Sequence, residues 1–288
     1  MSFNKKPLII NLAITGNVPT TDDNPHVPIT PEEIAEDAAR CRDHGASTVH
    51  IHARDEDEEP VPDPDLFAEI IEKIRERCPE MIICSTTSGR VYTSFEQRSA
   101  PLELEGIHKP DMASLTLGSN NFAREASVNT PQMIQSLAER MLERDIVPEL
   151  EVFEPGMIDY SQYLLKKGKL ERPLYYNLLL GNLGTLQATP LNLARMADAL
   201  PENAEWGAAG IGTCQFDVNC QAITMGGHVR VGLEDNIWMD RDKTELATNP
   251  DLVKRVGDVA TSMNRPVATP AQAREILGLG PPAGQSEA

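Results

Sequence analysis

Residues 48–54 of this 288-residue chain read TVHIHAR, which indicates a buried strand with two histidines near its end. Alternate side chains of a β-strand point to the same face. His50 and His52 therefore point one way, and Val49 and Ile51 point the other. Two imidazoles side by side on a rigid strand end provide half of a divalent-metal site. The pair predicts a metal centre, with two core or surface histidines as the alternative.

Strand and helix patterns alternate outward from this stretch along nearly the whole chain. The predicted helices are amphipathic, and several begin with a Thr-Pro pair such as Thr30-Pro31, in which the threonine caps the helix. The predicted strands are residues 8–15, 48–53, 81–86, 112–117, 147–153, 174–180, 205–211 and 228–233. The predicted helices are residues 31–44, 65–77, 95–104, from 131 onward, 157–167, 190–200, 215–225, 250–263 and 270–277.

Eight strand–helix units predict an α/β fold of the (β/α)8 TIM-barrel type. The alternative, a doubly wound open sheet, is disfavoured because no Gly-x-Gly-x-x-Gly sequence follows the first strand. No linker divides the chain, so we expect one domain over residues 1–288. The segment from Gly278 is rich in Gly, Pro and Ala, and we expect it to be loosely held.

Composition limits the partners and the compartment. A formal net charge of −18 repels polyanions, so nucleic-acid binding is not expected, although a small anion remains compatible with a local basic site or backbone N–H groups. No apolar run is long enough for a membrane span, and the N-terminal apolar run reads as a strand rather than a signal peptide. The five cysteines are odd in number and contain no Cys-x-x-Cys pair, which favours reduced thiols. We expect a cytoplasmic protein that forms a homo-oligomer, a tetramer or dimer.

The rest of the metal site should lie at the carboxyl ends of other barrel strands. Arg230 and Glu234 share the inward face of the last predicted strand. In a closed barrel this strand pairs with the first, which pairs with the strand of His50 and His52, so Glu234 can lie close to both histidines. Two histidines and one carboxylate leave coordination positions open for water or substrate. A helix-capping turn at residues 234–236 is the alternative, but an unpaired charge beside a buried Arg230 is costly.

Small and hydroxyl-bearing residues follow several other strands. Residues 86–90 read TTSGR and residues 114–122 read SLTLGSNNF, a composition that suits a bound carboxylate or thioester. Glycines in residues 181–184 and 210–213 permit close approach of a ligand to the backbone. Barrels often bind phosphate near their last two strands, so a nucleotide-like cofactor is compatible with this sequence.

Three segments together resemble the β-keto acid cleavage enzyme family. They are residues 14–17 (ITGN) followed by 24–34 (NPHVPITPEEI), residues 45–55 (GASTVHIHARD) and residues 231–236 (VGLEDN). The resemblance covers nearly the whole chain. It implies a (β/α)8 barrel with zinc, or another divalent metal, that condenses a β-keto acid with acetyl-CoA. The products would be acetoacetate and a new acyl-CoA.

The resemblance also implies roles for individual residues. His50, His52 and Glu234 match the metal ligands of the family. Arg230 and Asp235 match a charged pair that helps to generate the substrate carbanion. Asp235 would accept the proton, directly or through water, and Arg230 would orient it. Because Asp235 follows the inward-facing Glu234, it must reach the site through a bend at the strand end.

Four further residues match substrate contacts in the family. Thr86 and Gly89 match contacts to the substrate carboxylate, with Thr86 in place of a serine. Thr116 matches a further hydroxyl contact. Val18 stands where a family member that acts on an amine-bearing keto acid has an acidic residue. The resemblance therefore favours an uncharged acyl chain for this sequence.

The residues leave other functions open. A zinc amidohydrolase also uses His-x-His on a barrel strand, but it needs histidines on later strands, and residues 147–153 and 174–180 contain none. A metal-dependent aldolase would use the same half-site without CoA. A metal- or CoA-binding regulator without turnover is the non-enzyme alternative. Acetoacetate formation that requires acetyl-CoA distinguishes β-keto acid cleavage from these three alternatives.

Overall fold

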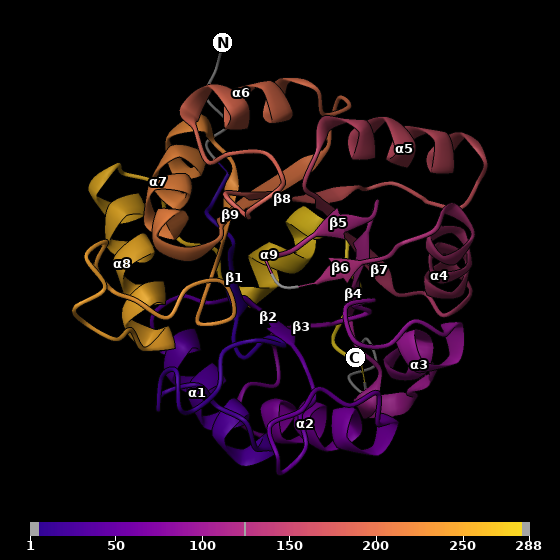
Figure 1. Cartoon of the computed structure of the whole chain (residues 1–288), viewed down its shortest axis with the longest axis horizontal. Coiled ribbons are helices and arrows are strands. Elements are labelled where there is room, and N and C mark those ends of the chain that lie inside the picture. Colours follow the sequence, from indigo (N-terminus) through magenta and orange to yellow (C-terminus); the bar gives the residue numbers. More distant parts are fainter. Residues whose placement is uncertain (1–5, 124, 284–288) are drawn as a thin grey trace.

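The computed structural model describes residues 6–123 and 125–283 as a closed barrel of parallel strands surrounded by helices (Figure 1). Around the barrel the strands follow the order β1-β10-β9-β8-β7-β4-β3-β2. This confirms the predicted (β/α)8 barrel. The barrel strands are β1 (Ile10–Ala13), β2 (Thr48–Ile51), β3 (Ile82–Ser85), β4 (Met112–Thr116), β7 (Val147–Val152), β8 (Tyr175–Leu180), β9 (Glu205–Gly210) and β10 (His228–Val231).

Helices follow the strands as predicted and begin at capped positions. Threonines 30, 130, 189, 248 and 269 each accept a hydrogen bond from the backbone N–H three residues later, and a proline follows within two residues. The helices are α1 (Pro31–Asp43), α2 (Pro64–Arg77), α3 (Phe95–Ser99), α4 (Pro131–Glu143), α5 (Pro155–Lys166), α6 (Pro190–Asp198), α7 (Gln215–Met225), α8 (Asn249–Ser262) and α9 (Pro270–Leu277). None of the described helices is long and apolar enough to cross a membrane.

Two local features differ from the predicted elements. The helix expected over residues 95–104 ends at Ser99 and continues as a 3-10 helix over Ala100–Glu103, where Pro101 interrupts the α-helical pattern. A short hairpin of β5 (Asn120–Asn121) and β6 (Ala126–Ser127) follows β4 and had no signal in the sequence. Of the tail from Gly278, Leu279 and Gly280 bond to Arg274 of α9, and residues 284–288 lie outside the described part.

The barrel interior consists of two different layers. Beneath the barrel, α9 packs against a buried apolar layer, which includes Ile9, Ile82 and Met112. Two residues further along the same strands, the buried side chains are polar or thiol-bearing, namely Asn11, Cys84 and Ser114. The alternation within each strand places both layers on the inward face. The polar layer therefore lies nearer to the carboxyl ends of the strands.

The seam between β1 and β10 positions the strand-end carboxylates. Leu12 pairs with Val231, and the Ala13 carbonyl accepts a hydrogen bond from the backbone N–H of Glu234 (3.2 Å). Gly232 lies so close to β1 that an added Cβ would stand 2.0 Å from the Ala13 carbonyl oxygen, and its φ is 158°. Only glycine permits this approach.

A Gly232→Ala substitution should therefore destabilise the barrel by about 1–3 kcal/mol through overpacking at the seam. The matched control is Gly156→Ala in α5, where an added Cβ meets no atom within 4 Å. That change should be neutral or stabilise by up to about 1 kcal/mol, because alanine favours helix. Thermal and denaturant unfolding of the two variants measures the difference. Equal stability of the two would contradict the assigned seam.

Candidate active site

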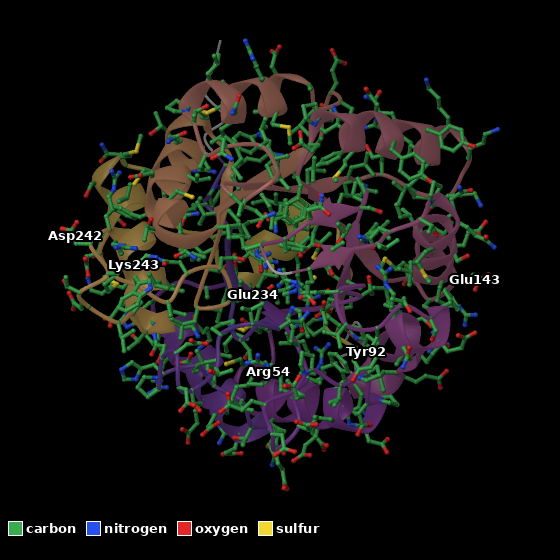
Figure 2. The ribbon with its side chains drawn as sticks, viewed as in Figure 1. Arg54, Tyr92, Glu143, Glu234, Asp242 and Lys243 are labelled. Atoms are coloured by element: carbon green, nitrogen blue, oxygen red, sulfur yellow. The ribbon has the colours of Figure 1, made fainter. Side chains whose placement is uncertain are left out.

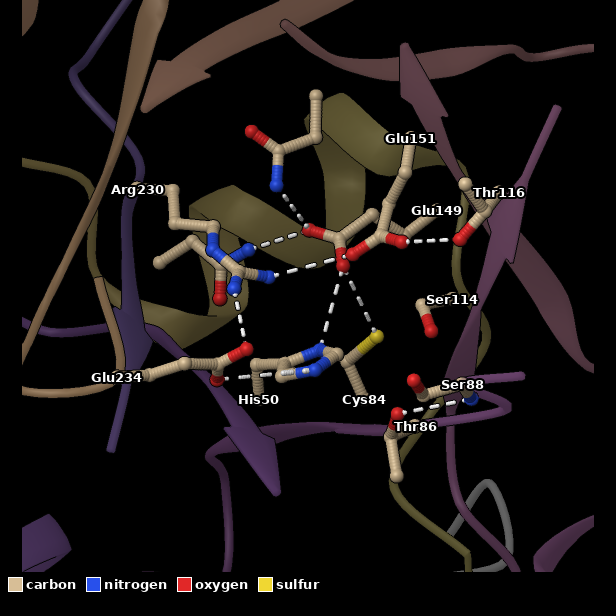
Figure 3. A network of polar contacts seen from close by, with 12 residues as sticks. His50, Cys84, Thr86, Ser88, Ser114, Thr116, Glu149, Glu151, Arg230 and Glu234 are labelled. Carbon is tan, nitrogen blue, oxygen red and sulfur yellow. Dashed lines mark hydrogen bonds and ion pairs between the residues drawn. The ribbon is translucent and has the colours of Figure 1, made fainter. Parts of the chain in front are cut away.

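A cavity of about 430 Å³ opens at the carboxyl ends of the barrel strands. Its wall includes His50 on β2, His52 directly after it, Glu151 on β7, Arg230 on β10 and Glu234 after that strand. Figure 2 shows Glu234 near the centre of the barrel. Figure 3 shows His50, Glu151, Arg230 and Glu234 turned toward one another. This is the end of a (β/α)8 barrel at which active sites lie.

Two histidines and one carboxylate converge on one point of this cavity. The Nε2 atoms of His50 and His52 lie 3.1 Å apart. Glu234 places Oε1 3.3 Å from the Nε2 of His52 and Oε2 3.9 Å from the Nε2 of His50. The two histidines are 1% and 3% exposed. The strand pairing predicted from the sequence has thus brought the three residues together.

The outer nitrogens of both imidazoles face hydrogen-bond acceptors. His52 Nδ1 lies 2.7 Å from the side-chain oxygen of Asn17, and His50 Nδ1 lies 3.4 Å from Oε2 of Glu149. A ring nitrogen beside an acceptor carries the proton, which leaves the lone pair on the other nitrogen. Both Nε2 lone pairs therefore point into the cluster.

This donor set fits a divalent cation. Two lone pairs 3.1 Å apart repel each other, and the buried Oε2 of Glu234 has no hydrogen-bond partner among the described residues. A cation between them satisfies all three atoms. Without a cation, a proton satisfies only some of these three atoms. Burial alone would lower the pKa of His50, but the neighbouring carboxylates of Glu234 and Glu149 together outweigh it and the pKa is raised. Two imidazoles and a carboxylate are ligands that zinc accepts, with positions left open.

Glu234 owes its position in part to Gly16 in the loop after β1. An added Cβ at Gly16 would stand 2.4 Å from Cγ of Glu234, and the φ of Gly16 is 73°. A side chain at this position would thus displace the carboxylate from the two histidines. Burial would raise the pKa of Glu234, but Arg230 and both histidines hold it well below its ordinary value. The carboxylate is therefore ionised.

Arg230 links the cluster of His50, His52 and Glu234 to two further carboxylates. Its side chain donates to both oxygens of Asp235 (2.9 and 3.2 Å), to Glu234 (2.7 Å) and to Glu151 (3.4 Å). Burial would lower the pKa of Arg230, but Asp235 and Glu234 raise it well above its ordinary value. The guanidinium is thus charged, although it is only 2% exposed. Asp235 reaches the cavity through a turn in which its N–H bonds to the Gly232 carbonyl, as the expected bend requires.

The residues matched to substrate contacts occupy different places. Thr86, Thr116 and Val18 line the cavity, and Val18 is 48% exposed. The Thr116 hydroxyl donates to Glu151 (2.6 Å). Gly89 is buried and is not part of the cavity wall, because it packs so tightly on Arg98 that an added Cβ would lie 2.6 Å from Nη1.

Residues 7–279 match a model of the family described as beta-keto acid cleavage enzyme. The chain belongs to the β-keto acid cleavage enzyme family. It is 42% identical over 274 residues to 3-keto-5-aminohexanoate cleavage enzyme of Fusobacterium nucleatum, covering 94% of this chain and 98% of that protein. It is 38% identical over 277 residues to 3-oxoadipate:acetyl-CoA acetyltransferase of Cupriavidus necator, covering 95% of each chain.

Solved structures agree on the fold. An apo structure of ObcA superposes with a TM-score of 0.79 at 20% sequence identity, over 89% of this chain and 66% of the ObcA chain. At this identity the likeness shows the barrel alone. The family match over most of the chain confirms the resemblance drawn from the three sequence segments, and with it that this chain is an enzyme of the β-keto acid cleavage type.

The sequence analysis overlooked two carboxylates of this family member. Glu149 and Glu151 lie on β7 and alternate with the buried Leu150 and Val152. This is the same i, i+2 pattern that identified the two histidines, and it could have revealed them. Asn17, which holds His52, lies in a loop and has no comparable periodic signal.

Replacing Arg230 by Gln should destabilise the protein by about 3–5 kcal/mol, because three carboxylates lose their common counter-charge in a buried site. The control is Arg140→Gln at a partly exposed ion pair with Glu103, which should cost about 1 kcal/mol or less. Denaturant unfolding of both metal-free variants measures the difference. An Arg230→Gln protein as stable as the Arg140→Gln control would refute the assigned charge balance.

Proposed function

We propose that this chain uses a divalent metal, zinc for preference, to cleave a β-keto acid in exchange with acetyl-CoA. His50, His52 and Glu234 would hold the ion. The observation that carries the proposal is the convergence of these three donor atoms beside the Arg230–Asp235 pair in one cavity. The name of the relative from Cupriavidus necator, an acetyl-CoA acetyltransferase that acts on a 3-oxo acid, supports acetyl-CoA as the second substrate.

The proposed exchange balances without an oxidant or a net gain of water. The methylene carbon between the keto group and the carboxylate forms a bond to the acetyl carbon of acetyl-CoA. The acetyl–sulfur bond of the thioester and the bond from the methylene carbon to the original keto carbon both break, and the CoA sulfur joins that keto carbon. The proton removed from the methylene carbon returns to it in the product. The products are acetoacetate and an acyl-CoA that carries the remainder of the substrate.

The charged pair beside the cluster has the arrangement needed to move a proton. A divalent ion, when bound, supplies Lewis acidity that lowers the barrier to removing a proton next to a carbonyl. Asp235 lines the cavity and would accept the methylene proton. Arg230 holds both oxygens of Asp235, which fixes the orientation of the carboxylate. Arg230 would also favour negative charge that develops on the substrate.

The remaining wall would bind the ends of the substrate. Thr86, directly after β3, and Thr116, at the end of β4, offer hydroxyls that would bind the substrate carboxylate. Val18 adds an apolar side chain to the cavity wall and is 48% exposed. An apolar side chain cannot pair with an ammonium group. We therefore propose an uncharged acyl chain rather than an amine-bearing one.

The purified protein should form acetoacetate from a β-keto acid only when acetyl-CoA is present. A chelator should abolish the reaction, and added zinc should restore it, because the metal supplies the Lewis acidity. A panel of substrates should show higher kcat/KM for uncharged acyl chains than for 3-keto-5-aminohexanoate. Acetoacetate and acyl-CoA are measured together, since the exchange yields them in equal amounts.

Three results would refute parts of this proposal separately. Acetoacetate formation without acetyl-CoA would refute the exchange and favour a lyase. Full activity after exhaustive chelation, with no metal detected in the protein, would refute the metal dependence. A preference for the amine-bearing substrate would overturn only the role given to Val18.

A further inference from the structure

The carboxylate of Glu149 lies inside the barrel, beneath the cluster of His50, His52 and Glu234. Glu149 projects from β7 and is 1% exposed. It is not part of the cavity wall, so it has no direct access to a substrate bound there. The chemistry proposed above assigns it no step.

Four donors from four other strands surround this carboxylate. Oε1 accepts hydrogen bonds from the side-chain amides of Asn11 on β1 (2.5 Å) and Asn177 on β8 (3.3 Å). Oε2 lies 3.5 Å from the thiol of Cys84 on β3 and 3.4 Å from Nδ1 of His50 on β2. Figure 3 shows Glu149 at the centre of these contacts, with His50 between it and Glu234.

Packing alone does not account for a charged group here. Barrel interiors are normally filled by branched apolar side chains, as the layer of Ile9 and Ile82 just below illustrates. A buried carboxylate requires compensation that an apolar residue would not need. Arg230 compensates this charge only at a distance, because its hydrogen bonds go to Asp235, Glu234 and Glu151. The Glu149 carboxylate must therefore serve a neighbouring group that needs a hydrogen-bond acceptor.

We propose that Glu149 is a positioning residue for His50. His50 Nδ1 has no hydrogen-bond partner among the described residues, and Oε2 of Glu149 lies 3.4 Å from it. As acceptor of the Nδ1 proton, Glu149 would fix the ring and its tautomer so that the Nε2 lone pair points at His52 and Glu234. The amides of Asn11 and Asn177 hold the other oxygen and prevent the carboxylate from turning away. This inference rests on the proposed metal function and adds a residue that acts through a ligand.

A second metal ion is the alternative use of the same atoms. One ligand atom each of His50, Cys84 and Glu149 lie within 4.8 Å of one another. However, the Oε1 atom of Glu149 already receives two N–H donors, and His50 would have to bridge two ions through both ring nitrogens. The contacts therefore favour a hydrogen-bonded support, and the experiment below distinguishes the two.

The opposite end of the barrel offers a matched control. There the buried His228 places Nε2 3.5 Å from Oε2 of Glu205, and its Nδ1 accepts a hydrogen bond from the Ile9 backbone N–H. Glu205 thus pairs with a histidine as Glu149 does, but neither partner belongs to the cavity wall. Substituting it tests the general effect of losing such a pair.

The experiment compares Co²⁺ binding to the full-length wild type, Glu149→Gln and Glu205→Gln by competition with a chromophoric chelator. Glutamine keeps the shape of the side chain but brings N–H donors among groups that are themselves donors. Glu149→Gln should bind Co²⁺ about 10- to 100-fold more weakly, with a shifted visible spectrum, whereas Glu205→Gln should match the wild type. Thermal unfolding in chelator verifies that each metal-free variant is folded.

Each result decides the inference. A folded Glu149→Gln protein with wild-type affinity and spectrum overturns it. So does a second equivalent of Co²⁺ with a thiolate-to-cobalt charge-transfer band, which would place an ion at Cys84. A wild type that binds no Co²⁺ or zinc refutes the metal function itself. If Glu149→Gln does not fold, Asn11→Ala replaces it, with an expected loss of at least about threefold in affinity; no loss overturns the inference.

Discussion

The acidic interior of this barrel depends on one buried cation. Arg230 enters from β10 and meets Asp235, Glu234 and Glu151, which lie on two different strands or strand ends. Buried carboxylates so close together would otherwise become protonated or disrupt the fold. Arg230 holds the pKa of Glu234 well below its ordinary value and so keeps this carboxylate available as a ligand. It also lowers the pKa of Asp235, although burial leaves that pKa above its ordinary value. The same ion pair thus serves stability and chemistry.

Much of the site was predictable because a closed barrel converts sequence alternation into proximity. His50 and His52 share a face of β2, Glu234 follows β10, and β1 joins these two strands. Strand order alone therefore brought the three donors together. Glu149 and Glu151 of β7 alternate in the same way but were not predicted, because a carboxylate pair on a strand is a less specific metal signal than a pair of histidines. Asn17 and the packing of Gly89 against Arg98 depend on loop conformations that no periodic pattern encodes.

The charge distribution also explains how an acidic protein can use anionic substrates. The net charge of −18 is a property of the whole chain, whereas Arg90, Arg230 and Lys243 line the cavity. Local cations and the ion bound by His50, His52 and Glu234 would offset the charge of a keto acid and of CoA where they bind. The polar layer below the cluster would then hold the His50 ring in position, while the apolar layer above α9 closes the barrel.

The central claim is that His50, His52 and Glu234 form the metal centre of this β-keto acid cleavage enzyme. The most direct measurement is a crystal structure of the zinc-loaded protein with anomalous scattering recorded at the zinc edge. One anomalous peak per chain should lie about 2.0–2.2 Å from Nε2 of each histidine and from a carboxylate oxygen of Glu234. A peak at Cys84 and Glu149 instead, or none at the two histidines in a crystal that binds zinc elsewhere, would contradict the account.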